Sequence, residues 1–205
     1  MSFLTLLPMA IVMIAGPQIL SAIFLATSEN WKRDSIAYVA GAALAITIFT
    51  SAAFFLGGGD PGGNSGNDDV YWIVLALLVA AMLHVYLKRA ESEPPKWMGK
   101  LQTASPGFTF RLGFLLLGVF PTDILTSAAV GSTVAARGDP WWHVFPFVAL
   151  TLLLLSLPML TLLILGERGQ QLLPKARQWM TDNSWVVNEI VLLLFVALTI
   201  SDIAG

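Results

Sequence analysis

The sequence predicts an all-helical, polytopic membrane protein with six transmembrane helices in two inverted three-helix repeats and with both termini outside. Three observations support this prediction: an apolar composition, six long apolar segments, and basic residues confined to alternate connections. Of the 205 residues, 56% are apolar and only 12% are charged, and the mean hydropathy is +0.75. Soluble domains carry roughly 25% charged residues. The composition therefore excludes an ordinary soluble globule, and it equally excludes a disordered chain.

Six segments are long and apolar enough to cross a bilayer, which takes about 20 helical residues. None of them alternates apolar and polar residues in the manner of membrane-barrel strands. The first segment is charge-free, but it lacks the basic start of a signal peptide and is too long for one. The expected helices are residues 3–27, 35–56, 70–87, 108–134, 142–165 and 186–204.

Lysine and arginine residues lie in or beside the first, third and fifth connections, which account for ten of the eleven; only Arg137 lies elsewhere. Because basic residues are retained in the cytoplasm, we expect these three connections to be cytoplasmic and both termini to face out. A single transmembrane domain is expected over residues 1–205. Repeat one covers about 1–87, a cytoplasmic link about 88–107, and repeat two about 108–205.

The first helix of each half has a proline near its middle, Pro17 in one and Pro121 in the other. Proline removes a backbone N–H and clashes with the carbonyl four residues back, and in lipid the freed group needs a partner. With three spans per half, the second half must enter from the opposite face, as in transporters that bind substrate where interrupted helices meet. A simple proline kink is the alternative. The candidate substrate- or ion-binding residues are Gly16, Pro17, Gln18, Pro121, Thr122 and Asp123.

Asp123 is the most informative polar residue, because it lies near the middle of an expected membrane helix. An aspartate at a helix centre costs about 2.5–3.5 kcal/mol of insertion free energy. It is a candidate proton carrier, cation ligand or partner for an ammonium group. The alternative is a structural hydrogen bond to the broken backbone near Pro17 or Pro121. Gln18, its counterpart in the first helix, is a candidate substrate ligand or a cap for the broken turn.

Several other chemistries are excluded by residue type. There is no cysteine, so disulfides, thiolate metal sites and dithiol electron transfer are impossible. Neither histidine has a second ligand at metal-binding spacing, so we expect no metal and no cofactor. The run from Gly131 to Val134 lacks the Gly-x-Ser-Gly turn of intramembrane serine proteases, and no lysine lies inside a span to hold retinal. We therefore do not expect an enzyme.

Short motifs follow one another along the whole chain: Gly16-Pro17, Ala26-Thr27-Ser28, Tyr38 with Gly41, Pro94-Pro95-Lys96-Trp97-Met98, Phe110-Arg111-Leu112-Gly113, Pro121 to Leu125, and Val186-Val187-Asn188. With six helices in two inverted halves, this order resembles the lysine-exporter (LysE) superfamily. Within it, the sequence is most similar to the GAP group, the sulfolipid- and peptidoglycolipid-addressing proteins. One motif departs from the family: its helix-4 pattern, Pro-x-Asn-Leu, reads Pro-Thr-Asp-Ile here, so a carboxylate replaces a neutral amide.

The resemblance implies a multi-pass protein of the cell (plasma) membrane that exports or flips a lipid-linked or small polar solute. We expect alternating access around a midplane site between residues 3–27 and 108–134, with Asp123 as the coupling or substrate-cation residue. An amino-acid or cation exporter and a non-transporting scaffold or accessory subunit remain alternatives. Expected partners are membrane lipids, the solute, a coupling proton or sodium ion and a second copy of the chain, but no nucleic acid. Residues 91–105 are expected along the inner interface, against anionic lipid.

Overall fold

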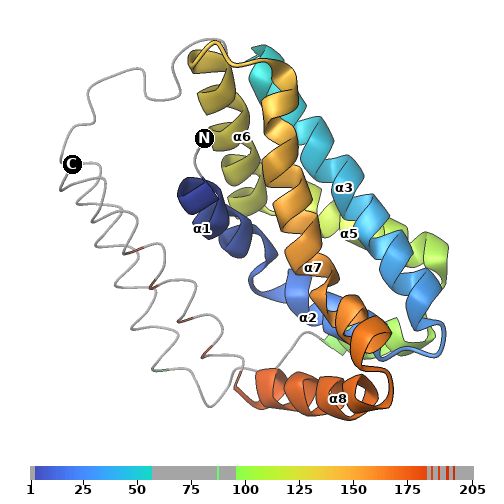
Figure 1. Cartoon of the computed structure of the whole chain (residues 1–205). Coiled ribbons are helices and arrows are strands. Elements are labelled where there is room, and N and C mark those ends of the chain that lie inside the picture. The colour runs from blue at the N-terminus through green and yellow to red at the C-terminus, as the bar shows by residue number, and fades with distance from the viewer. Residues whose placement is uncertain are drawn as a thin grey trace.

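The computed structural model describes residues 3–56 and 96–183, together with the single residues 87, 186, 189, 193 and 196. Every regular element in this part of the chain is a helix, which confirms the all-helical prediction there (Figure 1). The expected helices 70–87 and 186–204 lie outside the described residues, apart from those single positions. Six spans and an inverted repeat therefore remain predictions.

Two of the expected helices are each broken into two. α1 (Phe3–Ile14) and α2 (Pro17–Ala26) meet at 68°, and α5 (Pro106–Gly118) and α6 (Pro121–Ala136) meet at 67°. The single helices expected at 3–27 and 108–134 are corrected accordingly. Both prolines occupy the first turn of the second helix, where no intrahelical partner for the missing N–H is needed. At the first break Gly16 adopts φ +87°, a backbone conformation that suits glycine.

Two helices are unbroken: α3 (Trp31–Leu56) and α7 (Phe145–Leu165), the latter preceded by the short η3 (Trp141–Val144). Each, α7 together with η3, is long and apolar enough to cross a membrane. The residues that the structure describes thus contain two candidate spans, or up to four if each bent pair counts as one. This finding supports the prediction that the chain is a membrane protein.

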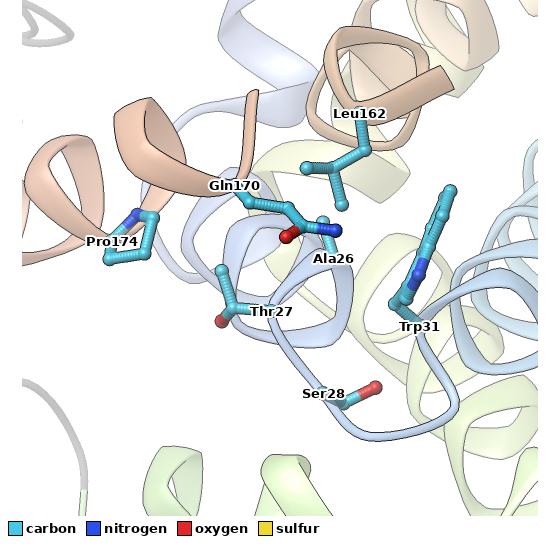
Figure 2. Close-up of a pocket in the computed structure, with 7 residues that line it drawn as sticks. All are labelled: Ala26, Thr27, Ser28, Trp31, Leu162, Gln170 and Pro174. Atoms are coloured by element: carbon cyan, nitrogen blue, oxygen red, sulfur yellow. The ribbon is translucent and has the colours of Figure 1, made fainter. Parts of the chain in front are cut away.

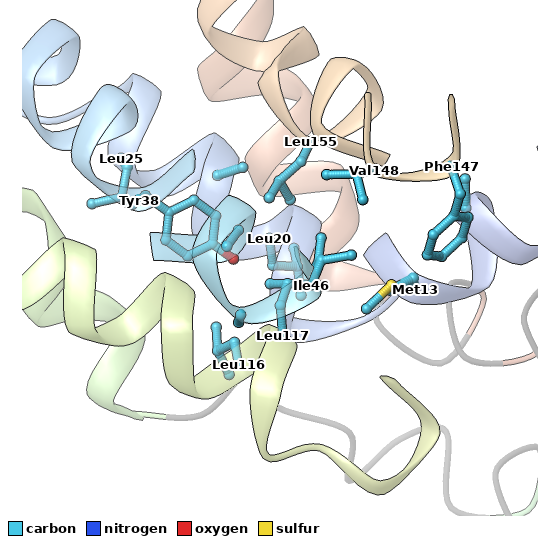
Figure 3. Packing of buried hydrophobic residues seen from close by; sticks show 14 of the residues in the cluster. Met13, Leu20, Leu25, Tyr38, Ile46, Leu116, Leu117, Phe147, Val148 and Leu155 are labelled. Carbon is cyan, nitrogen blue, oxygen red and sulfur yellow. The ribbon is translucent and has the colours of Figure 1, made fainter. Parts of the chain in front are cut away.

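The helices pack closely because small residues lie where they cross. α3 contacts both α5 and α6, while α7 contacts α1, α2 and α3 (Figure 1). A Cβ added at Gly41 would collide with the carbonyl oxygen of Phe110, and one added at Gly113 with that of Tyr38. Small residues let the helix backbones approach closely, and the resulting van der Waals packing favours helix association in membranes. Around the crossings, side chains such as Ile46 and Leu117 form the buried core (Figure 3).

Two further helices lie at the end of the bundle where α2 ends, and both contact α2. η2 (Lys96–Thr103) buries Leu101 and contains most of the segment expected along the inner interface. α8 (Glu167–Asp182) crosses this end of the bundle (Figure 1) and was not expected from the sequence. Gly166, at φ +51°, turns the chain from α7 into α8. α8 buries Leu173 and exposes charged residues, as an interfacial helix does.

Candidate functional site

The candidate site lies where the two broken helices meet. Gln18 is the second residue of α2 and Asp123 the third of α6. The Gln18 amide Nε2 donates a hydrogen bond to Asp123 Oδ2 over 2.8 Å, joining residues 105 positions apart. Only 2% of Gln18 and none of Asp123 is exposed. The structure thus brings together the two polar residues that the sequence analysis selected, while their role in binding remains a prediction.

Asp123 does not lie in the middle of a continuous helix, which corrects the sequence-based expectation. It occupies the first turn of α6, directly after the break. The first turn of a helix lies at the positive end of the helix dipole, which favours a carboxylate. The insertion cost of a helix-centre aspartate therefore does not apply in full at this position.

The remaining predicted residues lie at the two helix breaks and take no part in the hydrogen bond between Gln18 and Asp123. Gly16 and Pro17 form the first break, and Pro121 starts α6. Thr122 is exposed, but its hydroxyl donates to Asp123 Oδ1 over 3.4 Å. Within the described part of the chain, the Gln18 side chain bonds only to Asp123, the Asp123 side chain also accepts from Thr122, and neither bonds to a backbone group.

Two side chains outside the predicted set hold the start of α2. The Tyr38 hydroxyl, from α3, donates to the Gln18 carbonyl oxygen over 2.9 Å. The Ser21 hydroxyl donates to the Pro17 carbonyl oxygen over 2.6 Å. Both side chains are fully buried. Tyr38 appeared in the sequence only as part of a family motif, and nothing in its spacing indicated that it reaches the break.

The site keeps unused hydrogen-bonding capacity. Among the described residues, Gln18 Oε1 is buried with no hydrogen-bond partner, as is the hydroxyl of Ser127. Ser127 lies one helical turn after Asp123, on the same side of α6. Buried polar atoms are normally paired, so the unpaired Gln18 Oε1 can still accept a hydrogen bond from a further donor.

Comparison with known proteins agrees with a membrane role. A family profile described as "Sap, sulfolipid-1-addressing protein" matches residues 6–202, almost the whole chain. No curated protein and no solved structure matches the sequence. The match covers both broken helices and both residues of the buried pair. The chain therefore belongs to the sulfolipid-1-addressing protein family.

Proposed function

We propose that this protein is a multi-pass transporter of the plasma membrane that exports or flips a lipid-linked or small polar solute, without covalent chemistry. The observation that supports it most is the buried hydrogen bond between Gln18 and Asp123. It joins the first turns of α2 and α6, the segments that follow the two breaks. Transporters place their sites where such interrupted helices meet. The family's description, sulfolipid addressing, supports a lipid-related substrate, and we propose that the family lies within the LysE superfamily.

The packing supports two inverted repeats. The unbroken helix of the first half, α3, lies against the broken pair α5–α6 of the second half. The unbroken helix of the second half, α7, lies against the broken pair α1–α2 of the first. The two breaks also have nearly equal bends, 68° and 67°. A pseudo-twofold axis between the two breaks would produce this reciprocal packing, in which the unbroken helix of each half lies against the broken pair of the other. Rocking of one half against the other would then give alternating access.

Asp123 is the proposed coupling or substrate-contacting group. The ion-pair contact found among the described side chains joins His143 to Asp139, so no basic residue of that part of the chain pairs with Asp123. A buried carboxylate without a basic partner needs a proton, a cation or further donors to be stable. A ligand, proton or sodium ion that displaces the Gln18 amide would thereby separate the two halves.

The distribution of basic residues supports the orientation. α8 carries Arg168, Lys175 and Arg177, and α3 begins beside Lys32 and Arg33, all at the end of the bundle where α2 ends. Arg137 follows α6 at the opposite end (Figure 1). By the positive-inside rule the α8 end faces the cytoplasm.

The test is mass spectrometry of lipids and polar solutes that co-purify with the protein in mild detergent. Wild type is compared with Asp123→Leu, Asp123→Asn and the control Asp139→Asn, which makes the same charge change away from the site. We expect wild type and Asp139→Asn to retain a specific compound that Asp123→Leu loses. Retention by Asp123→Asn would favour a hydrogen-bonded solute, and loss would favour a cation. Equal retention by all four would contradict the proposed site, and no specific compound on any would favour a scaffold.

A further inference from the structure

A second feature lies at the other end of α2, about 12 Å from Gln18 at 1.5 Å per helical residue. A cavity of about 220 Å³ lies between the end of α2, the start of α3, the end of α7 and α8. Figure 2 shows its walls, with the Gln170 side chain of α8 extending toward α2 and α7. Its lining includes Thr27, Ser28, Trp31, Leu162, Gln170 and Pro174.

One side of this cavity is polar, and a positive charge lies just outside its wall, next to the lining residue Thr27. Arg177 of α8 donates from Nη1 to the hydroxyl of Thr27 over 3.2 Å. Its guanidinium carbon lies 4.9 Å from the centre of the Phe24 ring, a cation–π distance. These two contacts hold the guanidinium beside the cavity. Since a guanidinium has five N–H donors, most of them remain available to a ligand.

The charge of Arg177 is not neutralised by the part of the chain described. No carboxylate there lies within ion-pair distance of it. The buried carboxylate of Asp34 accepts a hydrogen bond from the Ser28 hydroxyl over 2.8 Å. The other charged residues of the surrounding elements are mixed in sign, with basic ones in excess: Lys32, Arg33, Arg168 and Lys175 against Glu29, Glu167 and Asp182.

The other side of the cavity is apolar and adjoins a lipid-facing surface. Trp31, Leu162 and Pro174 supply apolar walls. The last residues of α7, Leu163 and Ile164, are strongly exposed, as expected for side chains in contact with acyl chains. An amphipathic helix such as α8 lies at headgroup depth. At its rim beside Thr27, the cavity therefore places an acyl-chain environment next to a guanidinium, a group that binds phosphate well.

We propose that an anionic phospholipid binds at the rim of this cavity, with its phosphate against Arg177, which the hydroxyl of Thr27 positions, and with its apolar part against the walls of the cavity. The bound lipid joins α8 to α2 and so stabilises this end of the bundle. A free phosphate offers the same headgroup chemistry, but it would leave the apolar walls uncovered. The site is separate from the Gln18–Asp123 pair and does not depend on transport there.

The experiment measures the thermal unfolding midpoint of the purified full chain in detergent. Probes are short-chain phosphatidylglycerol, phosphatidylcholine of the same chain length, and inorganic phosphate. Because a ligand that binds only the folded state stabilises it, phosphatidylglycerol is expected to raise the wild-type midpoint by several degrees and the other two probes much less. Arg177→Gln should weaken the apparent affinity for phosphatidylglycerol roughly tenfold, the loss of one charge-assisted hydrogen bond. Thr27→Val should give a smaller loss in the same direction.

The matched control is Arg168→Gln, an equal charge change at an exposed position of the same helix. It is expected to keep the wild-type response, even if either variant lowers the midpoint without lipid. The proposal is overturned if Arg177→Gln responds to phosphatidylglycerol as wild type does, or if Arg168→Gln loses the response equally. It is also overturned if phosphatidylcholine or inorganic phosphate reproduces the full effect, since then neither the anionic charge nor the lipid is required.

Discussion

At the residue scale, the position of Asp123 explains how an acidic side chain is accommodated in an apolar bundle. Because α6 begins at Pro121, the carboxylate lies in a first helical turn, at the positive end of the helix dipole. Because α2 begins at Pro17, Gln18 occupies the matching place on the other broken helix and can donate its amide. The same prolines that interrupt the helices therefore create the polar environment that the pair requires.

A double-mutant cycle measures this bond. Gln18→Leu leaves the buried carboxylate without its amide donor, and Asp123→Leu leaves the amide without its acceptor, so each alone is expected to lower the unfolding free energy. The double variant should be less destabilised than the sum of the two single variants, with a coupling of about 0.6–1.7 kcal/mol, from the average to the largest value for hydrogen bonds between membrane helices. The measurement is reversible unfolding in mixed detergent.

The control for that cycle pairs Gln18→Leu with Ser156→Ala. Ser156 is half-buried on α7, and its hydroxyl bonds only locally, to the Leu153 carbonyl oxygen. Distant sites are additive within about 0.3–0.5 kcal/mol. A coupling between Gln18 and Asp123 no larger than this control value would show that the buried bond contributes nothing specific.

At the element scale, the contact between α3 and α5 depends on two glycines, one on each helix, and each lies against the backbone of the other helix. Gly41 lies against Phe110 and Gly113 against Tyr38, and Tyr38 also bonds the start of α2. The separation of α3 from α5 thus fixes the position of Tyr38, and with it the first break. A change at this crossing should therefore reach the candidate site, although it touches neither Gln18 nor Asp123.

Gly41→Ala tests the crossing. The added Cβ would overlap a backbone carbonyl, which cannot rotate away, so the helices must separate. We expect a loss of about 1–3 kcal/mol, the usual cost of overpacking. The control is Gly107→Ala at the start of α5, where a Cβ meets nothing within 4 Å and alanine is the better helix former. Unfolding midpoints in detergent provide the comparison, and equal midpoints for the two variants would contradict the predicted contact.

The elements differ in how well the sequence predicts them. Long uncharged runs predicted α3 and α7, and Pro17 and Pro121 marked the positions of both breaks. A proline alone does not reveal whether a helix bends slightly or ends, because that depends on the partners of the freed backbone groups. α8 was missed because its charges and Pro174 are typical of a connection, and its apolar side is narrow.

The candidate site shows the same limit. Gln18 and Asp123 are recognisable because polar side chains are costly within apolar segments. Tyr38 and Ser127 are not, because a tyrosine or serine in a membrane helix has many ordinary packing roles. Their contribution depends on contacts between residues distant in sequence, which composition and spacing do not encode.

At the scale of the whole molecule, the proposed orientation follows from charge, and the sequence offers a direct test because it has no cysteine. Single cysteines can be introduced at exposed positions without removing a native thiol. Gln102 of η2 and Gln171 of α8 represent the end expected in the cytoplasm, and Ala136 at the end of α6 represents the other. All three side chains are exposed, so differences in labelling will reflect the side of the membrane rather than burial.

In intact cells, a membrane-impermeant maleimide is expected to label Ala136→Cys but not Gln102→Cys or Gln171→Cys. After permeabilisation all three should react, which controls for accessibility of each thiol. This pattern requires that η2 and α8 share one side although several helices separate them in sequence, as two inverted halves with cytoplasmic basic connections demand. Labelling of Gln102→Cys and Gln171→Cys from opposite sides would contradict the inverted arrangement. Labelling of both from outside, with Ala136→Cys protected, would instead reverse the orientation and leave the arrangement of the halves intact.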